Sequence, residues 1–405
     1  MTNLPQGWKV KTLSEISEIV TGSTPSKSNL DFYGKDYPFF KPSDFEQGYF
    51  LENAGDNLSK LGFDKARQLP PKTILVVCIG SLGKVALTRV IGSCNQQINA
   101  IIPHKNIIAE YIYYYCISSK FQSILFSKAP QTTLAILNKT EFSKLEIIYP
   151  KDIKEQERIV GILDESFAKI DESIKILEQN LLNLDELMQS ALQKAFNPLK
   201  DNAKENYKLP QGWEWKSLGE IGEIITGTTP SKNNPNFYGN EYPLFKPSDL
   251  NGDMIIKYAS DNLSKLGFDN ARNLPKDTIL VVCIGASIGK VGLSGVNGSC
   301  NQQINAIIPN SAFTSKYLFF VCLSNYFQEI LKNNASQTTL PIINKTEFSK
   351  LQIPLPPIKE QEQITSHLDE LSSHVKNLKQ NYQAQIKDLQ ELKNSLLDKA
   401  FKGNL

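Results

Sequence analysis

The sequence lacks several features that would assign it quickly to a class. No apolar run approaches the roughly 20 residues that cross a bilayer. The start, Met1 to Pro5, has neither a basic segment nor an apolar one, so no signal peptide is visible. The 3 histidines, His104, His367 and His374, share no spacing typical of a catalytic triad or ligand set, which favours surface or packing roles. We therefore expect a cytoplasmic protein without a membrane span.

Closely spaced cysteines are also missing. The chain has 6 cysteines and no C-x-x-C pair, which argues against a zinc site and against a disulfide scaffold. Cys78 lies in the apolar run from Ile74 to Ile79. Because cysteine is among the most buried residue types, we expect reduced, buried thiols.

The chain has no strong excess of charge of either sign. The net charge is +2, so composition alone does not indicate a nucleic-acid-binding protein. Basic residues outnumber acidic ones by 16 to 12 in residues 1–150 and by 13 to 11 in residues 206–354, whereas residues 151–205 carry 8 against 12. This distribution fits DNA contact by the two basic regions, although only weakly.

What the chain does contain is a long internal sequence repeat. Leu4 to Trp8 returns as Leu209 to Trp213, and the segment from Gly92 to Pro103 returns unchanged from Gly298 to Pro309. The period, near 205 residues, is far longer than the roughly 20–50 residues of solenoid repeats. It indicates two whole domains of one fold, which suits a two-fold object such as duplex DNA with an inverted repeat.

Each repeat divides into a globular part and a helical part. Ile74–Ile79 and Ile98–Ile102 are short apolar runs bounded by Gly or Pro, which predicts strands, and Ala109–Phe126 has helical periodicity. We expect mixed α/β domains dominated by antiparallel strands. The predicted boundaries are 1–150 and 201–355 for the domains, and 151–200 and 356–405 for a helix with linker and a second helix.

The helical parts carry a coiled-coil pattern with a four–three alternation of apolar residues over 154–196, and a second apolar face over about 359–401. The residues predicted to pair the helices are Leu163, Phe167, Ile170, Ile174, Leu177, Leu181, Leu184, Leu368, Val375, Leu378, Tyr382, Leu389, Leu392 and Leu396. Each helix would be roughly 60 Å long. The expected fold is α+β: two tandem domains joined by two long antiparallel helices in a coiled coil, with pseudo-two-fold symmetry.

The sequence shows no recognisable catalytic motif. Gly285 to Val291 resembles a Walker A loop but is one residue short and lacks Ser or Thr after Lys290. The equivalent Gly80 to Val85 is shorter still, so a turn that touches a phosphate, or a plain hairpin turn, is favoured over nucleotide hydrolysis. Neither methyltransferase motifs nor the carboxylate–lysine set of a nuclease is present. The sequence predicts no metal site and no cofactor of its own.

Polar and basic residues suited to base edges and phosphates recur in both repeats. The alternative is that they only shape turns and strand ends. The predicted DNA-binding residues are Lys41, Ser43, Lys60, Ser81, Lys84, Asn95, Gln96, Gln97, Thr132, Thr133, Lys139, Lys246, Ser248, Lys265, Ser287, Lys290, Asn301, Gln302, Gln303, Thr338, Thr339 and Lys345.

The ordered motifs resemble those of the specificity (S) subunits of type I restriction–modification enzymes, the HsdS family. They are Leu-Pro-x-Gly-Trp, Thr-Gly-x-Thr-Pro-Ser, Gly-x-x-Gly-Lys-Val, Asn-Gln-Gln and Thr-Thr-x-x-x-Ile, and they end in Pro354 to Gln361, with a divergent copy from Tyr149 to Gln156. The resemblance covers nearly the whole chain. It implies two target-recognition domains that each read half of a split DNA sequence, with helices that set the spacer between the halves.

The resemblance also implies partners. Two modification subunits, which are adenine methyltransferases using S-adenosylmethionine, and ATP- and Mg-dependent restriction subunits would supply the catalysis. Because the two repeats are so similar, we expect a near-palindromic target. An S-like subunit of a related two-component system or of an orphan methylase remains an alternative, as do a self-sufficient DNA enzyme and a coiled-coil adaptor.

Overall fold

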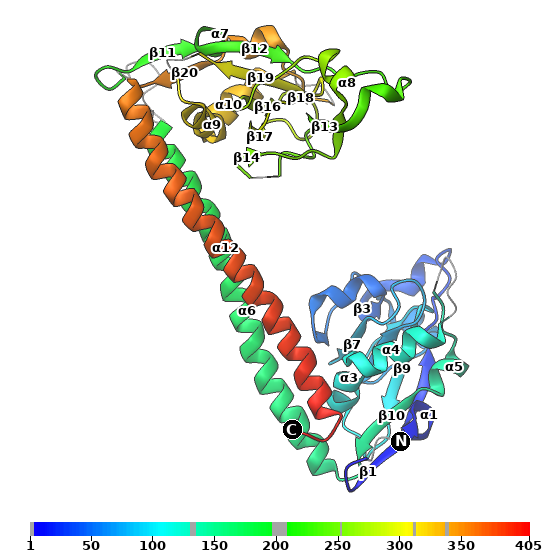
Figure 1. Ribbon diagram of the computed structural model, residues 1–405. Coiled ribbons are helices and arrows are strands. Elements are labelled where there is room, and N and C mark those ends of the chain that lie inside the picture. Colours follow the sequence, from blue (N-terminus) through cyan, green and yellow to red (C-terminus); the bar gives the residue numbers. More distant parts are fainter. Residues whose placement is uncertain (1–3, 130–134, 197–208, 252, 311–312, 337–339) are drawn as a thin grey trace. The chain divides into compact units, whose positions relative to one another are not determined.

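The protein divides into two compact units, shown in the computed structural model of Figure 1, which describes residues 4–129, 135–196, 209–251, 253–310, 313–336 and 340–405. Unit 1 comprises residues 1–177 and 383–405, and unit 2 comprises residues 178–382. The boundaries fall inside the two long helices rather than at the ends of the globular parts. Each unit therefore contains one globular domain and a portion of both helices.

The globular part of unit 1 alternates short strands with short helices. Its strands are β1 Trp8–Thr12, β2 Ser17–Thr21, β3 Tyr33–Phe40, β4 Phe50–Leu51, β5 Asp56–Leu58, β6 Ile74–Val77, β7 Val85–Thr88, β8 Ser93–Cys94, β9 Ile98–Pro103 and β10 Glu146–Pro150. Its helices are α1 Leu13–Ile16, η1 Leu30–Phe32, η2 Pro42–Gln47, α2 Lys60–Lys65, α3 Ala109–Ile117, α4 Ser119–Lys128 and α5 Lys139–Ser143.

These strands form a five-stranded sheet in the order β2-β9-β6-β7-β4, a three-stranded sheet β5-β3-β8 and a pair β1-β10. Most pairs are antiparallel, and only β4 with β7 and β3 with β8 are parallel among the described pairs. The predicted mixed α/β domain with mainly antiparallel strands is confirmed.

Strand β6 shows why the central run is apolar at every position. Ile74 and Val76 belong to the core that packs on α3 and α4, whereas Leu75 and Val77 belong to a second core on the opposite face. Because alternate side chains of a strand point to opposite faces, burial on both faces demands a continuous apolar run. All four residues are 0% exposed.

Unit 2 repeats this arrangement. Its strands are β11 Glu214–Ser217, β12 Gly222–Thr226, β13 Tyr238–Phe245, β14 Ile255–Ile256, β15 Asp261–Leu263, β16 Ile279–Val282, β17 Val291–Ser294, β18 Ser299–Cys300, β19 Ile304–Pro309 and β20 Gln352–Leu355. Its short helices are α7 Leu218–Ile221, η3 Pro235–Phe237, α8 Lys265–Asp269, α9 Ser315–Leu323, α10 Asn325–Asn333 and α11 Lys345–Ser349. The sheets are β12-β19-β16-β17-β14, β15-β13-β18 and β11-β20.

The predicted single helix over 109–126 is wrong in one respect, because Ser118 divides it into α3 and α4. The Ser118 hydroxyl donates to the Tyr115 carbonyl at 2.6 Å, and the Phe121 backbone N–H donates to the same hydroxyl at 3.4 Å. Serine at this place caps the second helix while its extended backbone turns the chain. The helical periodicity continued through the break and concealed it.

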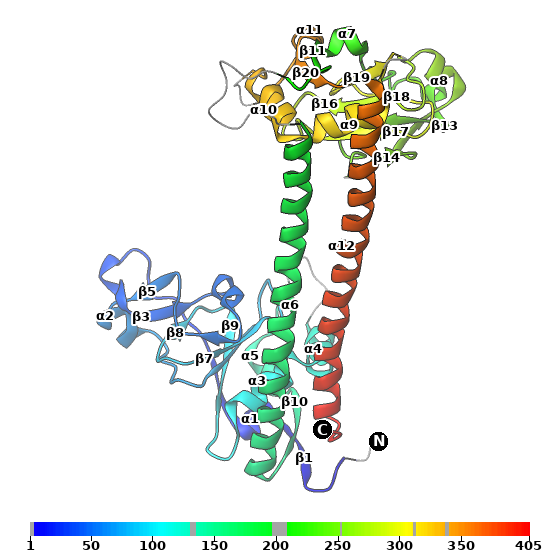
Figure 2. The ribbon, with the colours of Figure 1, turned by 90° about the vertical axis from the view of Figure 1, so that its left-hand side faces the viewer.

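The two long helices are confirmed as α6, Ile153–Phe196, and α12, Ile358–Ala400. In unit 1, Lys393 of α12 forms an ion pair with Asp171 of α6, and Arg158 donates to the Leu405 carbonyl at 3.0 Å. Residue numbers therefore rise along one helix as they fall along the other, so the helical segments of unit 1 are antiparallel (Figure 2). Every α6 residue predicted to pair is buried or half-buried.

In unit 2 the helical segments pack in the same sense. Lys379 of α12 forms an ion pair with Asp185 of α6. A groove of about 440 Å³ is lined on one side by α6, from Leu187 to Ala195, and on the other by α12, from Ile364 to Leu371. The core of this unit includes Leu192 together with Leu368.

Two predicted pairing residues of α12 were wrong. Leu378 is 41% exposed and Leu392 is 46% exposed, whereas the adjacent Lys379 and Lys393 side chains are only 30% and 22% exposed. The buried and half-buried positions follow an unbroken four–three alternation through Val375, Lys379, Tyr382, Ile386, Leu389 and Lys393, so the seam contains the lysines and not the leucines beside them. Each lysine covers the seam with its aliphatic stem while its ammonium group reaches an aspartate.

Among the described residues, no helix is long and apolar enough to cross a membrane.

Candidate nucleic-acid interface

The Thr-Gly motif after β2 is fixed to the loop that follows β8. The Gly22 backbone N–H donates to the Ile98 carbonyl at 3.0 Å, and the Ser23 N–H donates to the Cys94 carbonyl at 2.9 Å. A side chain at Gly22 would have its Cβ 2.1 Å from the Asn95 carbonyl oxygen. Only glycine allows this approach, so the motif is needed to join two loops.

Unit 2 has the same junction. The Gly227 N–H donates to the Ile304 carbonyl at 3.0 Å, and a Cβ at Gly227 would lie 2.2 Å from the Cys300 carbonyl oxygen. The recurrence of these contacts shows that the repeated motif fixes local structure in both domains.

Most polar groups of the Asn-Gln-Gln motif form hydrogen bonds within the motif. The Asn95 amide nitrogen donates to Gln97 Oε1 at 2.9 Å, and the Gln97 backbone N–H donates to Asn95 Oδ1 at 3.1 Å. The matching Asn301–Gln303 distances are also 2.9 and 3.1 Å. Asn95 is 8% exposed. The amides of both asparagines are thus bonded internally and buried, so base contact by Asn95 and Asn301 stays a prediction that requires these hydrogen bonds to open.

The middle glutamines of these motifs differ from their neighbours. Gln96 and Gln302 are exposed. Their Oε1 atoms accept hydrogen bonds from the Thr24 hydroxyl at 2.5 Å and the Thr229 hydroxyl at 2.8 Å. Among the described residues their amide nitrogens have no hydrogen-bond partner, so they are available as donors at the surface.

The Gly-x-x-Gly-Lys-Val segment closes the hairpin between β6 and β7. Leu82 is buried, whereas Ser81 and Lys84 are exposed. The Gln122 amide nitrogen holds the turn from α4, because it donates to the Gly83 carbonyl at 2.9 Å and to the Cys116 carbonyl at 2.7 Å. Lys84 forms an ion pair with Glu46 at 3.2 Å, so the turn lies beside η2, which carries Ser43.

The second copy is a hairpin as well, between β16 and β17. Gln328 donates to the Gly289 carbonyl at 2.8 Å, and Lys290 donates to the Pro247 carbonyl at 3.3 Å, next to Ser248. Ser287 is half-buried and Ser248 is exposed. A Walker A loop connects a strand to a helix, so these strand-to-strand turns do not have the context of a nucleotide-hydrolysis loop.

Several predicted basic residues are paired with carboxylates. Lys41 forms an ion pair with Asp56, and Lys246 forms one with Asp261. The hydrogen bond from Lys246 lowers the pKa of the Asp261 carboxyl, and this outweighs its partial desolvation. Because both partners of each pair already satisfy one another, a phosphate would have to compete with the carboxylate for the lysine.

Two further pairs lie on short helices of the three-stranded-sheet region. Lys60 contacts Asp64 at 2.8 Å, and Lys265 pairs with Asp269 in the same i,i+4 arrangement. Exposed pairs of this kind contribute little to stability because solvent screens them, so an anion such as a phosphate can compete with the carboxylates.

Lys139 and Lys345, the first residues of α5 and α11, are exposed and have no ion pair among the described residues. The predicted residues Thr132, Thr133, Thr338 and Thr339 lie outside the described residues.

The carboxylates of the Pro-Ser-Asp segments serve as caps. Asp44 accepts hydrogen bonds from the Lys41 N–H at 2.7 Å and the Gly55 N–H at 3.0 Å. Asp249 accepts from the Lys246 N–H at 2.8 Å and the Ser260 N–H at 3.0 Å. Over the part of the chain that the structure describes, no group of three or more His, Cys, Asp or Glu residues could hold a metal ion.

The predicted burial of the cysteines is confirmed, since all six are buried and free. Burial raises the pKa of the Cys78 and Cys283 thiols to about 12. These thiols are neutral at physiological pH and act as packing groups.

The sequence did not predict that two glutamine side chains hold the long helices to the globular domains. Gln156, in the first turn of α6, is 0% exposed, and Gln361, in the first turn of α12, is 1% exposed. Gln156 Oε1 accepts from the Ile108 N–H at 2.9 Å while its Nε2 donates to the Pro150 carbonyl at 2.9 Å. These side chains fasten each long helix to its globular domain. Their recurrence after a Glu in both repeats was the available signal.

Comparison with known proteins agrees with this architecture. The sequence model of the family described as "Type I restriction modification DNA specificity domain" matches twice, over residues 5–182 and 210–388. The HindI specificity subunit of Haemophilus influenzae is 36% identical over 191 residues, covering 46% of this chain and 42% of that protein. The MjaIX specificity subunit of Methanocaldococcus jannaschii is 24% identical, covering 99% of this chain and 94% of its own length.

Two solved structures share the fold. A chain from the structure titled "Structural basis underlying complex assembly and conformational transition of the type I R-M system" has a TM-score of 0.82 at 21% identity, with 100% of both chains covered. The HsdS subunit from Thermoanaerobacter tengcongensis has a TM-score of 0.57 at 20% identity, with coverage of 99% and 98%. Since the family model matches both repeats and most of the chain, this protein belongs to the type I restriction–modification DNA specificity (HsdS) family.

Proposed function

We propose that this chain selects the DNA sequence on which a type I restriction–modification complex acts, and that each globular domain reads one half of a bipartite target. The observation that carries the proposal is the duplication. Both repeats match the specificity-domain family, and both have the same internally bonded motifs with exposed polar groups beside them. Two equivalent readers suit the two equivalent strands of duplex DNA.

The chain supplies recognition, and its partners supply catalysis. Two modification subunits, which use S-adenosylmethionine, and restriction subunits, which use ATP and Mg, assemble with it on DNA in the cytoplasm. The lack of any catalytic motif in the sequence supports this division of roles. The recognition domains are residues 1–150 and 201–355, and residues 151–200 and 356–405 form the spacer helices and a linker.

DNA contact is proposed for the exposed members of the predicted set. These are Gln96 and Gln302, the turn residues Ser81, Lys84 and Lys290, Ser43 and Ser248, and the unpaired Lys139 and Lys345. Lysines bind phosphates and fix position, whereas amides and hydroxyls can contact base edges. The paired lysines, Lys84 together with Lys41, Lys60, Lys246 and Lys265, would make this contact by exchanging a carboxylate for a phosphate.

The long helices are proposed to set the number of unspecified base pairs between the half-sites and to dock the modification subunits. One heptad adds about 10 Å to a helix, so seven residues inserted into both helices, after Leu177 and after Tyr382, keep the apolar period. The spacer should then lengthen by at most about three base pairs of roughly 3.4 Å. An unchanged spacer would refute the ruler role.

The target is proposed to be a near-palindrome, because the two domains share most of their sequence. Differences are expected from Phe45–Gly55 against Leu250–Ser260 and from Ala86–Ile91 against Gly292–Asn297. Two unrelated half-sites would contradict this.

The deciding experiment is to produce the chain with its modification subunits in a methylation-deficient bacterial host and to sequence the methylated adenines. We expect one bipartite motif with a fixed spacer. The matched control omits this chain and should yield no motif. Methylation without sequence preference in the complete complex would overturn the proposal, and methylation by this chain alone would show that it is itself an enzyme.

A further inference from the structure

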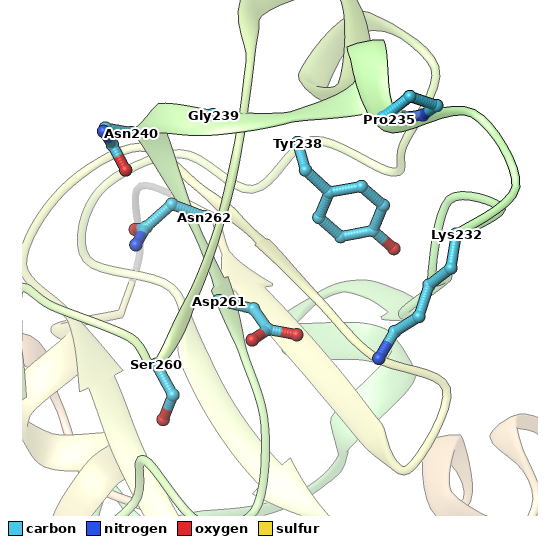
Figure 3. A pocket seen from close by; sticks show the side chains of 8 residues that line it. All are labelled: Lys232, Pro235, Tyr238, Gly239, Asn240, Ser260, Asp261 and Asn262. Atoms are coloured by element: carbon cyan, nitrogen blue, oxygen red, sulfur yellow. The ribbon is translucent and has the colours of Figure 1, made fainter.

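A pocket of about 450 Å³, lined by both polar and apolar groups, lies in unit 2 between η3, the start of β13 and β15. The residues that matter for its chemistry are Lys232, Tyr238, Asn240, Ser260, Asp261 and Asn262. Figure 3 shows the Tyr238 ring as a wall, with Asn240 and Asn262 at one end and Lys232 at the other. A flat apolar wall between amides and an ammonium group suits a nucleotide.

Most polar groups of this pocket are already bonded within the protein. The Tyr238 hydroxyl donates to the Pro230 carbonyl at 2.6 Å, and the Ser260 hydroxyl donates to Asp249 Oδ1 at 2.5 Å. Asp261 is paired with Lys246. These groups are therefore a rigid frame rather than free ligands.

Asn240 is different. It is exposed, and its amide has no hydrogen bond with any residue that the structure describes. It lies where the pairing of β13 with β15 slips, because both Tyr238 and Tyr242 oppose Leu263. A bulge of this kind turns a side chain out of the strand ladder and is often found beside functional sites.

The residues on either side of Asn240 are held in place. A Cβ at Gly239 would lie 3.1 Å from the Ser264 Cα, so the strand approaches the next element closely at this point. The Glu241 carboxylate accepts a hydrogen bond from the Lys265 backbone N–H at 3.1 Å. Asn240 is thus an unbonded amide presented by a fixed backbone.

Unit 1 has the same frame with a different residue at its apex. Tyr33 and Tyr37 both oppose Leu58, and the Tyr33 hydroxyl donates to the Pro25 carbonyl at 2.7 Å. The Lys60 N–H donates to Asp36 Oδ2 at 3.2 Å, as Lys265 does to Glu241. The apex residue here is Lys35, which is exposed and has no ion pair in the described part of the chain.

This difference changes what each unit can recognise. An asparagine amide both donates and accepts and pairs with the N6 and N7 atoms of adenine, whereas a lysine only donates and pairs with O6 and N7 of guanine. Resting on the proposed function, we infer that Asn240 and Lys35 are specificity-determining residues at equivalent positions of the two half-sites. The half-site read by unit 2 has adenine where the half-site read by unit 1 has guanine.

The test exchanges the two residues. Complexes of the chain with its modification subunits carry N240K, K35N or both, and the motif is determined by sequencing methylated adenines and by competition binding. We expect N240K to replace A·T by G·C in the half-site read by unit 2, so that both half-sites have G·C at this position. K35N should replace G·C by A·T in the other half-site, so that both have A·T. The parent complex should bind the preferred base pair at that position on the order of tenfold more tightly than the other, and each variant should reverse this preference.

Matched controls place the same changes elsewhere. N333K adds a lysine on the exposed side of α10, and K120N removes one from α4. Both should leave the motif unchanged. If N240K leaves every base preference as it was, or weakens binding to all sequences alike, Asn240 is not a specificity determinant. If the complex with the parent sequence methylates no specific motif, the proposed function itself is refuted, and this inference falls with it.

Discussion

The buried glutamines at the starts of the long helices allow a quantitative prediction. Replacing Gln156 by methionine keeps the side-chain volume but removes the acceptor for the Ile108 N–H and the donor to the Pro150 carbonyl, both bonded at 2.9 Å. A third bond, to the Asn106 carbonyl at 3.3 Å, lies at an exposed residue where water can replace it. Two groups are then left unsatisfied.

Each unsatisfied buried group costs about 1–3 kcal/mol. The local free energy of opening at the start of α6 should therefore fall by about 3 kcal/mol, which corresponds to a roughly 100-fold faster exchange of the Ile108 amide. Hydrogen–deuterium exchange with mass spectrometry of peptides around Ile108 measures this directly. The equivalent Q361M variant, which removes bonds of 3.2 and 3.0 Å, should show a similar effect at Thr314.

The control is Q179M on the same helix. Gln179 is exposed and bonds only to Asn183 at 3.0 Å, a helical pair worth a few tenths of a kcal/mol. If Q156M accelerates exchange at Ile108 no more than Q179M does, the buried amide does not fasten the helix and the reasoning is wrong.

Three further predictions follow from the site. Asn95→Ala should lower thermal stability measurably while Gln96→Ala leaves it within about 0.5 kcal/mol of the parent in a melting experiment; equal effects would contradict the internal role of the asparagine. Removing Lys139 and Lys345 should reduce the slope of log affinity against log salt by about one for each lysine, and an unchanged slope would exclude phosphate contact. Because burial raises the pKa of the Cys78 thiol from 9.0 to about 12, folding favours its neutral form, so stability should decline as pH rises above about 9. Alkylation of Cys78 between pH 8 and 9 should require unfolding, and rapid labelling of the folded chain would contradict its burial.

The elements that the sequence predicted well are those whose pattern has one physical explanation. The run at Ile74–Val77 is apolar throughout because both faces of β6 are covered, and the long four–three alternation can only serve a helix. The seam position at Lys379 was missed because the adjacent Leu378 is more apolar, whereas in the structure Lys379 forms an ion pair with Asp185 of α6.

The amide-rich motifs show what a pattern cannot distinguish. An Asn-Gln-Gln segment reads equally well as a base-reading loop or as a loop that bonds to itself, since the same donors and acceptors serve both. Only the geometry of Asn95 with Gln97 separates the two possibilities. The bulge residues Lys35 and Asn240 escaped notice for the opposite reason, because they differ between the two copies of an otherwise repeated segment, 32–38 and 237–243.

The close approach at Gly22 and Gly227 has a consequence for how such proteins diversify. A single substitution at either glycine would force two backbone segments apart and disturb everything they carry, so these positions tolerate almost no change. The apex residues Lys35 and Asn240 are exposed and have no hydrogen bond or ion pair among the described residues, so their replacement should cost the fold little. If the apex residues read DNA as proposed, a new target can be reached by changing one residue without the risk of losing a folded protein.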